Sequence, residues 1–345
     1  MKKYSAAGVD VDLGNQVKSG IGKIVAGTKR PEVLSAIGGF GGLFSAKSGV
    51  FKKLKDPVLV SSIDGVGTKL KVAEMADRHD TIGEDLVNHC VNDIAVTGAE
   101  PLFFLDYVGT AKLEPSRFTA ILTGLARGCK KAGCSLIGGE TAQMPGLYHG
   151  KDYDLVGTIV GVVDRKKILD GKSIKTGDIL IGLPSSGLHT NGYSLARNIL
   201  FDKLGLTLKS RIPGEKKTLG ELLLAVHVNY LPLLRKVHTI AKVKGLAHIT
   251  GGGLLDNLPR ILPKSVDARI NIESWPIPPL FQYLVNEGDI VGAEPYQVFN
   301  MGIGMVIVVS KADAPKVLKL TKGYQIGKII KGKGQVQLHA DPPAH

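Results

Sequence analysis

Short strand-like apolar stretches alternate with helical patterns along most of the 345 residues. Residues 82–94 carry apolar side chains at the spacing of one helix face. A second predicted helix, residues 115–132, begins at Pro115 and ends before Gly133, and both residue types are favoured at those positions. The stretches "PLFFLDYVG", "SLIGG" and "YDLVGTIVGVVD" are predicted strands. This alternation predicts an α/β (α+β) fold.

A polar and charged stretch, residues 164–178, interrupts the alternation. We therefore predict two domains, residues 1–168 and 177–345, joined by a linker at 169–176. A second α/β pattern follows the linker. Its expected elements are the strand "ILIGLP", a helix from Tyr193, a long helix near 219–236, a strand into "GLAHITGGG", a helix from Leu254 and the strand "MGIGMVIVV".

The chain is basic, with 44 Lys and Arg against 31 Asp and Glu and a formal charge of +13. The lysines are spread along the chain and aromatic residues make up only 6%, which argues against a nucleic-acid binder. A positive field also attracts anionic small molecules such as phosphates. The densest basic region is expected to be a solvated face; it contains Lys316, Lys319, Lys322, Lys328, Lys331 and Lys333.

The chain shows no sign of a membrane or secretory location. No apolar run approaches the roughly 18–20 residues that span a bilayer. The N-terminus reaches Asp10 and Asp12 before any apolar core, so we expect no secretory signal. The three cysteines show neither a disulfide framework nor zinc-type spacing. We expect a cytoplasmic protein with reduced thiols and no membrane partner.

The stretch "PVLVSSIDGVGTKLKVAE", residues 57–74, ends a strand pattern with an acid, two glycines, a hydroxyl and a lysine. Asp64 is suited to hold a cation such as Mg²⁺, and Lys69 is suited to meet a phosphate. The stretch therefore indicates either a site for a metal-bound polyphosphate or a tight turn with solvated charges. The tripeptide Gly171-Lys172-Ser173 could end a P-loop. The first glycine of that motif would fall at residue 166, which is a lysine, so a P-loop is excluded there. The glycine-rich residues 38–42 are interpreted as a flexible flap or a close turn.

Three acids lie at predicted element ends: Asp64, Asp93 and Glu140. Such acids gather where loops converge in an α/β fold, and three carboxylates together require a cation. In the functional interpretation, the three acids hold a Mg²⁺ ion that bridges ATP phosphates. The alternative is that Asp93 and Glu140 are ordinary helix-end or capping acids.

Two later stretches, "SSGLHTNG" (185–192) and "HITGGG" (248–253), stand immediately before predicted helices. Free backbone N–H groups and the helix dipole attract anions there, which favours a phosphorylated substrate. Ser185 or Asn191 is alternatively a plain N-cap. His248 is a candidate general acid or base, or a hydrogen-bonded structural histidine.

Together and in this order, these segments resemble the phosphoribosylformylglycinamidine cyclo-ligase family, also called aminoimidazole ribonucleotide synthetases. The likeness extends from "YSAAGVDVDLGN" to about residue 331 and includes "DGVGTKL", "GCSLIGGETAQMPGLYHGKDYDLVGTIVGVV", "SSGLHTNGYSLAR" and "HITGGGLLDNLPRILP". It implies the two-domain PurM-like fold, with an N-terminal mixed-sheet domain that binds ATP and forms a homodimer and a C-terminal domain that binds substrate.

The resemblance implies ATP-dependent cyclisation of formylglycinamidine ribonucleotide (FGAM) to aminoimidazole ribonucleotide (AIR), with release of ADP and phosphate. It implies ATP and Mg²⁺ as cofactors, with a monovalent cation such as K⁺ as a further candidate. The predicted catalytic residues are Asp93, His248 and Lys69, and the predicted metal ligands are Asp64, Asp93 and Glu140. The predicted ATP-binding residues are Asp64, Gly65, Gly67, Thr68 and Lys69. The predicted substrate-binding residues are Ser186, Gly187, Thr190, Asn191, Gly192 and His248.

The sequence departs from the family pattern at three places. Residues 225–229 read "AVHVN" where Pro-Thr-Arg-Ile-Tyr is usual, Gln143 replaces a Glu, and Gln297 replaces an Arg. These changes leave open any substrate contact at those positions. Sibling ATP-using enzymes, such as thiamine-monophosphate kinase or selenophosphate synthetase, and a catalytically inactive scaffold are the competing interpretations.

Overall fold

The computed structural model describes residues 20–340, so the expectation about an N-terminal signal lies outside the described residues. The chain divides into two compact units, Met1–Ile168 and Leu169–His345. Both combine a mixed β-sheet with helices, which confirms the predicted fold class. In the described part of the chain, every helix is too short or too polar to cross a bilayer.

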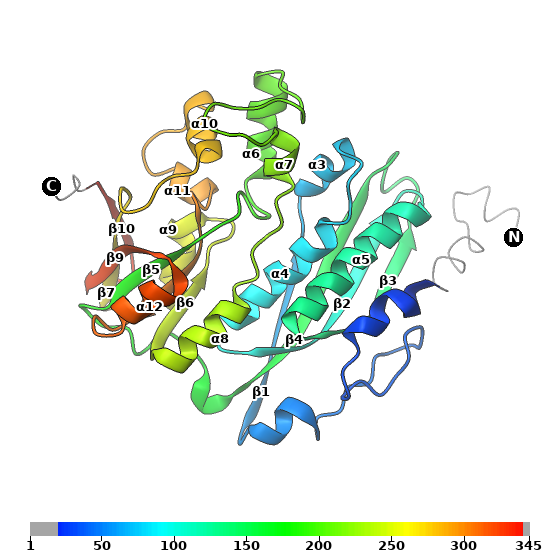
Figure 1. Ribbon diagram of the computed structural model, residues 1–345, viewed down its shortest axis with the longest axis horizontal. Helices are drawn as coiled ribbons and strands as arrows, with labels where there is room; N and C mark the ends of the chain where they lie inside the picture. Colours follow the sequence, from blue (N-terminus) through cyan, green and yellow to red (C-terminus); the bar gives the residue numbers. More distant parts are fainter. Residues whose placement is uncertain (1–19, 341–345) are drawn as a thin grey trace, which may run out of the picture. The chain divides into compact units, whose positions relative to one another are not determined.

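Unit 1 is built on a four-stranded sheet of order β1-β4-β2-β3. β1 and β2 both run antiparallel to β4, whereas β2 and β3 are parallel. Figure 1 shows α4 and α5 lying together along this sheet. The elements are η1 (Ala26–Thr28), η2 (Gly49–Lys53), β1 (Pro57–Gly65), α3 (Lys69–Met75), α4 (Ile82–Ala95), β2 (Glu100–Thr110), α5 (Pro115–Ala132), β3 (Ser135–Gln143), β4 (Tyr153–Asp164) and η3 (Arg165–Lys167).

The two predicted helices of unit 1 are confirmed as α4 and α5. Pro115 lies in the first turn of α5, and Gly133 ends it in the left-handed conformation that a Cβ disfavours. The two helices approach closely at Gly83 and Gly124. A Cβ on Gly124 would lie only 3.2 Å from the Gly83 Cα. α4 is buried on nearly every side, including the polar side that its periodicity defines.

Unit 2 is built on a six-stranded sheet of order β10-β7-β9-β5-β8-β6. Only the β10–β7 pair is parallel among the described strands of this sheet. The elements are β5 (Ile179–Pro184), α6 (Tyr193–Arg197), the π-helix η4 (Asn198–Lys203), α7 (Leu219–Leu223), α8 (Leu231–Ile240), β6 (Val243–His248), α9 (Gly253–Asn257), η5 (Leu258–Ile261), β7 (Val266–Asn271), α10 (Pro279–Glu287), α11 (Pro295–Val298), β8 (Ile303–Val309), α12 (Ala314–Thr321), β9 (Tyr324–Lys331) and β10 (Val336–His339).

The prediction of one long helix near 219–236 was wrong. The structure divides it into α7 and α8, separated by residues 224–230. Pro232 lies in the first turn of α8, where its missing N–H and its ring are tolerated, whereas a continuous helix would place it in the interior. The intervening segment turns His227 into the core, where it is 1% exposed. The six C-terminal lysines are all exposed, as expected for a solvated face.

Candidate active site

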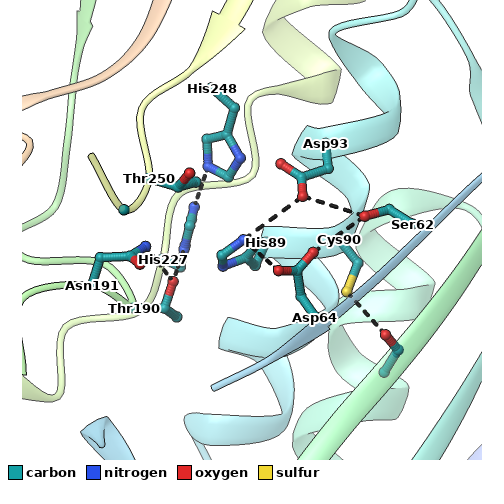
Figure 2. A network of polar contacts seen from close by, with 12 residues as sticks. Ser62, Asp64, His89, Cys90, Asp93, Thr190, Asn191, His227, His248 and Thr250 are labelled. Atoms are coloured by element: carbon teal, nitrogen blue, oxygen red, sulfur yellow. Dashed lines mark hydrogen bonds and ion pairs between the residues drawn. The ribbon is translucent and has the colours of Figure 1, made fainter. Parts of the chain in front are cut away.

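Asp64 and Asp93 form an acidic pair in unit 1. Asp64 lies near the end of β1, and Asp93 lies in the last turn of α4. The Ser62 hydroxyl lies 3.2 Å from Asp64 Oδ2 and 3.4 Å from Asp93 Oδ2. His89 Nε2 lies 3.4 Å from Asp64 Oδ1 and 3.8 Å from Asp93 Oδ2. Figure 2 shows these four side chains pointing toward one another.

The pair carries an electrostatic cost. Burial, followed by the hydrogen bond and negative charge of Asp93, raises the pKa of Asp64 to about 7, while the Ser62 hydroxyl acts in the opposite direction. Each aspartate side chain is 28% exposed, so an ion can reach both carboxylates. Oxygen ligands of this kind suit Mg²⁺, whose charge would relieve the repulsion. The donor set of Asp64 and Asp93 therefore fits the predicted metal.

The turn from β1 to α3 presents backbone to solvent. Gly65, Gly67 and Thr68 are exposed, whereas Val66 between them is fully buried and anchors the turn. Gly67 has a φ of +69°, which glycine adopts without the penalty of a Cβ. Thr68 is the N-cap of α3. The predicted ATP segment thus forms an anchored, solvent-facing turn immediately beside Asp64.

Lys69 differs from its neighbours in this turn. Its Nζ lies 2.8 Å from Asp85 Oδ2 on α4, and both side chains are fully buried. Burial lowers the pKa of Lys69, and the Asp85 carboxylate partly opposes that effect. In this structure the ammonium joins α3 to α4. The side chain of Lys69 is fully buried, so direct contact of its ammonium with a phosphate stays a prediction.

Glu140 does not join the acidic pair, and the expectation that all three carboxylates surround one ion was wrong. β1 and β3 are opposite edges of the sheet, about 14 Å apart at ordinary strand spacing. Across the sheet, Asp64 on β1 pairs with Gly157 on β4, Gly157 pairs with Asp106 on β2, and Asp106 pairs with Gly139 on β3. We call these four residues the Asp64 row. Glu140 is the next residue along β3, so its side chain faces the other side of the sheet. A single chain cannot hold one Mg²⁺ with Asp64 and Glu140 together.

Sequence reasoning did not single out Ser62, His89 or Asp106 as members of this region. Ser62 and Asp64 are two residues apart on one strand and therefore share a face, which is a signal available from the sequence. His89 and Asp93 are one helical turn apart on α4, which is a second signal. Asp106 lies in the same row as Asp64, and burial raises its pKa to about 7. That row depends on strand order, which the sequence does not reveal.

Three segments of unit 2 converge on the predicted substrate residues. The Ser186 hydroxyl donates to Val226 O, and Asn191 Nδ2 lies 3.4 Å from Thr190 Oγ1. A Cβ on Gly251 would lie 3.2 Å from Asn191 Oδ1, so loops 185–192 and 248–253 lie against each other. Asn257 Nδ2, which sequence reasoning missed, donates to three carbonyls of the second loop.

The helices that follow these loops begin where expected, but α6 and α9 have only five residues each. Their dipoles are correspondingly small. The N-caps are Gly192 and Gly252, and neither makes a side-chain cap hydrogen bond, so the alternative of Ser185 or Asn191 as an N-cap was wrong. The Ser185 hydroxyl instead donates to Asn300 Oδ1. Gly187 has a φ of +143° and lies on the same loop.

His248 ends β6 and is 5% exposed. Its Nε2 lies 2.9 Å from His227 Nε2, and the Nδ1 of His227 lies 3.4 Å from Thr190 Oγ1 (Figure 2). Residues 225–229, where the sequence departs from the family pattern, therefore place the His227 imidazole against His248, the candidate general acid or base. The other two departures lie elsewhere: Gln143 Oε1 accepts from Leu113 N–H at 3.4 Å, and Gln297 Nε2 donates to Asp256 Oδ2 at 3.3 Å.

Known proteins with this fold include remote structural relatives. The hydrogenase maturation protein HypE of E. coli superposes with a TM-score of 0.68 at 19% identity, covering 96% of this chain and 94% of that one. A HypE structure in complex with ATP superposes with a TM-score of 0.63 at 17% identity, covering 92% of this chain and 89% of that one. At these identities the likeness establishes the fold alone.

Sequence comparison gives a closer assignment. Residues 46–163 match the family described as AIR synthase related protein, N-terminal domain, and residues 175–339 match the corresponding C-terminal domain. The phosphoribosylformylglycinamidine cyclo-ligase of Geotalea uraniireducens (strain Rf4) is 54% identical over 333 residues, which cover 95% of each chain. The enzyme of the same name from Thermoanaerobacter sp. (strain X514) is 49% identical over 340 residues, covering 97% of this chain and 99% of that one. This chain therefore belongs to the phosphoribosylformylglycinamidine cyclo-ligase family.

Proposed function

We propose that this ligase of purine biosynthesis closes the imidazole ring of AIR from FGAM, with the nucleotide held by unit 1 and the ribonucleotide by unit 2. Family membership over nearly the full chain supports the reaction. The observation that carries the assignment of the nucleotide is the acidic pair Asp64 and Asp93 beside an exposed glycine turn. HypE, a protein of the same fold, has been crystallised with ATP.

The nucleotide site is proposed at the end of β1. Asp64 and Asp93 would hold Mg²⁺, which neutralises phosphate charge when bound. The exposed backbone at Gly65 and Gly67 and the Thr68 hydroxyl would contact the phosphates. His89, whose Nε2 lies 3.4 Å from Asp64 Oδ1 and 3.8 Å from Asp93 Oδ2, would orient Asp64. K⁺ is a further candidate for the same acidic region, and Glu140 is left out of this site.

The reaction needs positioning more than covalent chemistry from the protein. Transfer of the γ-phosphoryl group of ATP to the formyl amide oxygen of FGAM releases ADP. An amidine nitrogen then attacks the activated carbon, the C–O bond breaks, phosphate leaves and the nitrogen loses a proton. His248 is the proposed acceptor of that proton. Water must be excluded because it would hydrolyse the activated amide, and the glycine-rich residues 38–42 are the proposed flap.

The test of the nucleotide site is Asp64→Asn. Because Asp64 lies at a strand end and is partly exposed, the fold should survive, as circular dichroism and thermal melting would show. We expect kcat/KM for ATP, measured with FGAM as co-substrate, to fall by about 10²–10³-fold, the scale of a lost electrostatic contact in a transition state. Glu140→Gln is the matched control. An unchanged kcat/KM in Asp64→Asn would remove Asp64 from the site.

The substrate phosphate is proposed to bind at loop 185–192. Backbone donors at Gly187 and Gly192 and the side chains of Ser186, Thr190 and Asn191 are available without a dedicated arginine. The double variant Thr190→Ala, Asn191→Ala should weaken FGAM binding by about 1–3 kcal/mol, the range for hydrogen bonds to a charged group, and leave ATP affinity unchanged. Loss of ATP binding with normal FGAM affinity would show that the two substrates are assigned to the wrong units.

A homodimer formed through unit 1 is also proposed. β1 is an edge strand whose alternate residues are exposed, and these include Leu59 at 64% and Ile63 at 66%. Such an edge is normally paired or covered. Sedimentation at micromolar concentration should give twice the chain mass of 36.6 kDa, and a monomer mass would contradict the proposal. The three cysteines are buried and none forms a disulfide, which agrees with the proposed cytoplasmic location.

A further inference from the structure

Three histidines of unit 2 form a buried cluster. His189 comes from loop 185–192, His227 from the segment between α7 and α8, and His248 from the end of β6. Their exposed fractions are 1%, 1% and 5%. The His189 and His227 rings stack with centroids 4.0 Å apart, and the Nε2 atoms of His227 and His248 are 2.9 Å apart. One ring nitrogen of each histidine lies within 4.8 Å of the other two.

Two of the rings meet through their nitrogens. At 2.9 Å, the contact between His227 Nε2 and His248 Nε2 pairs one N–H with one lone pair, since two N–H groups or two lone pairs would repel at this distance. At least one ring therefore directs a nitrogen lone pair into the cluster, and such a lone pair is what a metal ion binds.

The spacing is close to that of a metal site. Three nitrogens bound at about 2.0–2.1 Å in a tetrahedral arrangement lie about 3.3 Å apart. The His227–His248 pair needs to open only slightly from 2.9 Å, and one ring nitrogen of His189 lies within 4.8 Å of both. His189 Nε2 now accepts from Ser186 N–H at 3.2 Å, and binding through that nitrogen would give up this bond. We therefore expect moderate affinity.

A further contact orients one ligand. The Nδ1 of His227 lies 3.4 Å from Thr190 Oγ1, which leaves its Nε2 directed at His248. Hydrogen bonding of the remote ring nitrogen is the usual way in which a metal-binding histidine is held. If the proton between His227 and His248 starts on His227 Nε2, it would move to Nδ1 and donate to the Thr190 hydroxyl, so no proton need be lost.

We propose that His189, His227 and His248 bind one divalent transition-metal ion of the zinc class. An all-imidazole donor set favours Zn²⁺, Co²⁺, Ni²⁺ or Cu²⁺ over Mg²⁺, which prefers oxygen ligands. Three protein ligands leave the fourth position to water or to a substrate group. The bound ion would occupy His248 Nε2. If His248 accepts the proton as proposed above, the ion inhibits turnover; the binding itself does not rest on that function.

Binding is tested on the untagged, metal-free full chain. Zn²⁺ affinity is measured by competition with a chromophoric chelator, and Co²⁺ is added separately to record its visible absorption. We expect one ion per chain and the intense absorption of four-coordinate Co²⁺. His227→Gln, which keeps a polar side chain of similar size, should weaken Zn²⁺ binding about 100-fold or more. His238→Gln changes an exposed histidine of α8 in the same unit and should leave the affinity unchanged.

The outcomes are separable. Equal Zn²⁺ affinity in His227→Gln and the unsubstituted chain, or an equal loss in His238→Gln, would overturn the site, as would the weak absorption of six-coordinate Co²⁺. If His227→Gln does not fold by thermal melting, His189→Gln provides the same comparison. In the turnover assay, Zn²⁺ should inhibit the unsubstituted chain reversibly and His227→Gln far less. Zn²⁺ binding without any effect on turnover would leave the site standing and refute the role of His248.

Discussion

The buried ion pair of Lys69 and Asp85 predicts a large stability effect with an unusual pH dependence. Asp85→Asn keeps the shape of the side chain and removes its charge, which leaves the ammonium of Lys69 without that neutralising carboxylate. Both side chains are fully buried, and the Nζ–Oδ2 distance is 2.8 Å. Removing one member of such a pair costs about 3–5 kcal/mol because an uncompensated charge stays in the interior.

The pH dependence follows from the pKa of Lys69. Burial already lowers this pKa, and the loss of Asp85 removes the group that opposes the effect. A lowered pKa means that the unfolded chain binds the proton more tightly than the folded chain, so stability rises with pH. Where Lys69 is neutral in the folded variant and protonated in the unfolded chain, the slope reaches about 1.4 kcal/mol per pH unit. The deficit of Asp85→Asn should therefore grow as the pH falls from 9 to 6.

Urea unfolding of the unsubstituted chain, Asp85→Asn, Lys69→Met and the double variant at several pH values measures these terms. The double variant should be more stable than the sum of the single losses predicts, by several kcal/mol, because it contains no uncompensated charge. Single losses below about 1 kcal/mol, or a deficit that shrinks at low pH, would refute the reasoning. The double variant also tests Lys69 in catalysis: a folded protein with normal kcat/KM for ATP would remove Lys69 from the phosphate site.

Three further predictions use other parts of unit 1. Asp93→Asn should weaken Mg²⁺ binding at least tenfold by isothermal titration, and Glu140→Gln should not, because β1 and β3 are opposite edges of the sheet. The pKa of Asp106 is raised from 3.8 to about 7 in the folded chain. The folded chain therefore binds this proton more tightly than the unfolded chain, and the resulting stability is fully present below pH 3.8 and lost as the pH rises through about 7. Asp106→Asn should accordingly gain stability relative to the unsubstituted chain between pH 6 and 8, by at most about 4 kcal/mol in urea unfolding. Gly124→Ala should lose about 1–3 kcal/mol despite the helix preference of alanine, since its Cβ would lie 2.5 Å from Asp80 O; a gain in melting temperature would contradict this packing.

Elements defined by local signals could be predicted from the sequence. α5 has a proline in its first turn, a periodic apolar face and a glycine at its end, and its predicted bounds were confirmed. The sequence also predicted that Asp64 and Asp93 lie together, because one acid ends a strand and the other ends the next long helix. The family resemblance, which rests on the segments and their order, implied the two-domain fold and the reaction. It did not tell which side chains contact one another in this chain.

The errors arose where a residue's environment depends on tertiary structure. Glu140 was assigned to the metal because it ends a strand pattern, but a strand end does not tell which edge or which face of the sheet it occupies. The side of α4 opposite the apolar face that its periodicity predicts is also buried and contains Asp85, the partner of Lys69. The division of the helix near 219–236 depends on Pro232 together with the burial of His227, and only the proline is a local signal.

The two clusters differ in the cations that they can select, and the difference follows from their charge states. Asp64 and Asp93 supply oxygen donors and repel each other, so a hard divalent cation is stabilised there by charge as well as by coordination. His189, His227 and His248 supply neutral nitrogen donors, so an ion there gains from coordination alone and bears the full cost of entering a buried site. Mg²⁺ coordinates imidazole poorly, so its coordination would not offset the free energy of desolvating the ion, whereas the coordination of Zn²⁺ or Co²⁺ would. Millimolar Mg²⁺ should therefore leave Co²⁺ absorption at the histidines unchanged, and excess Zn²⁺ should reach the aspartates only after the histidines are filled.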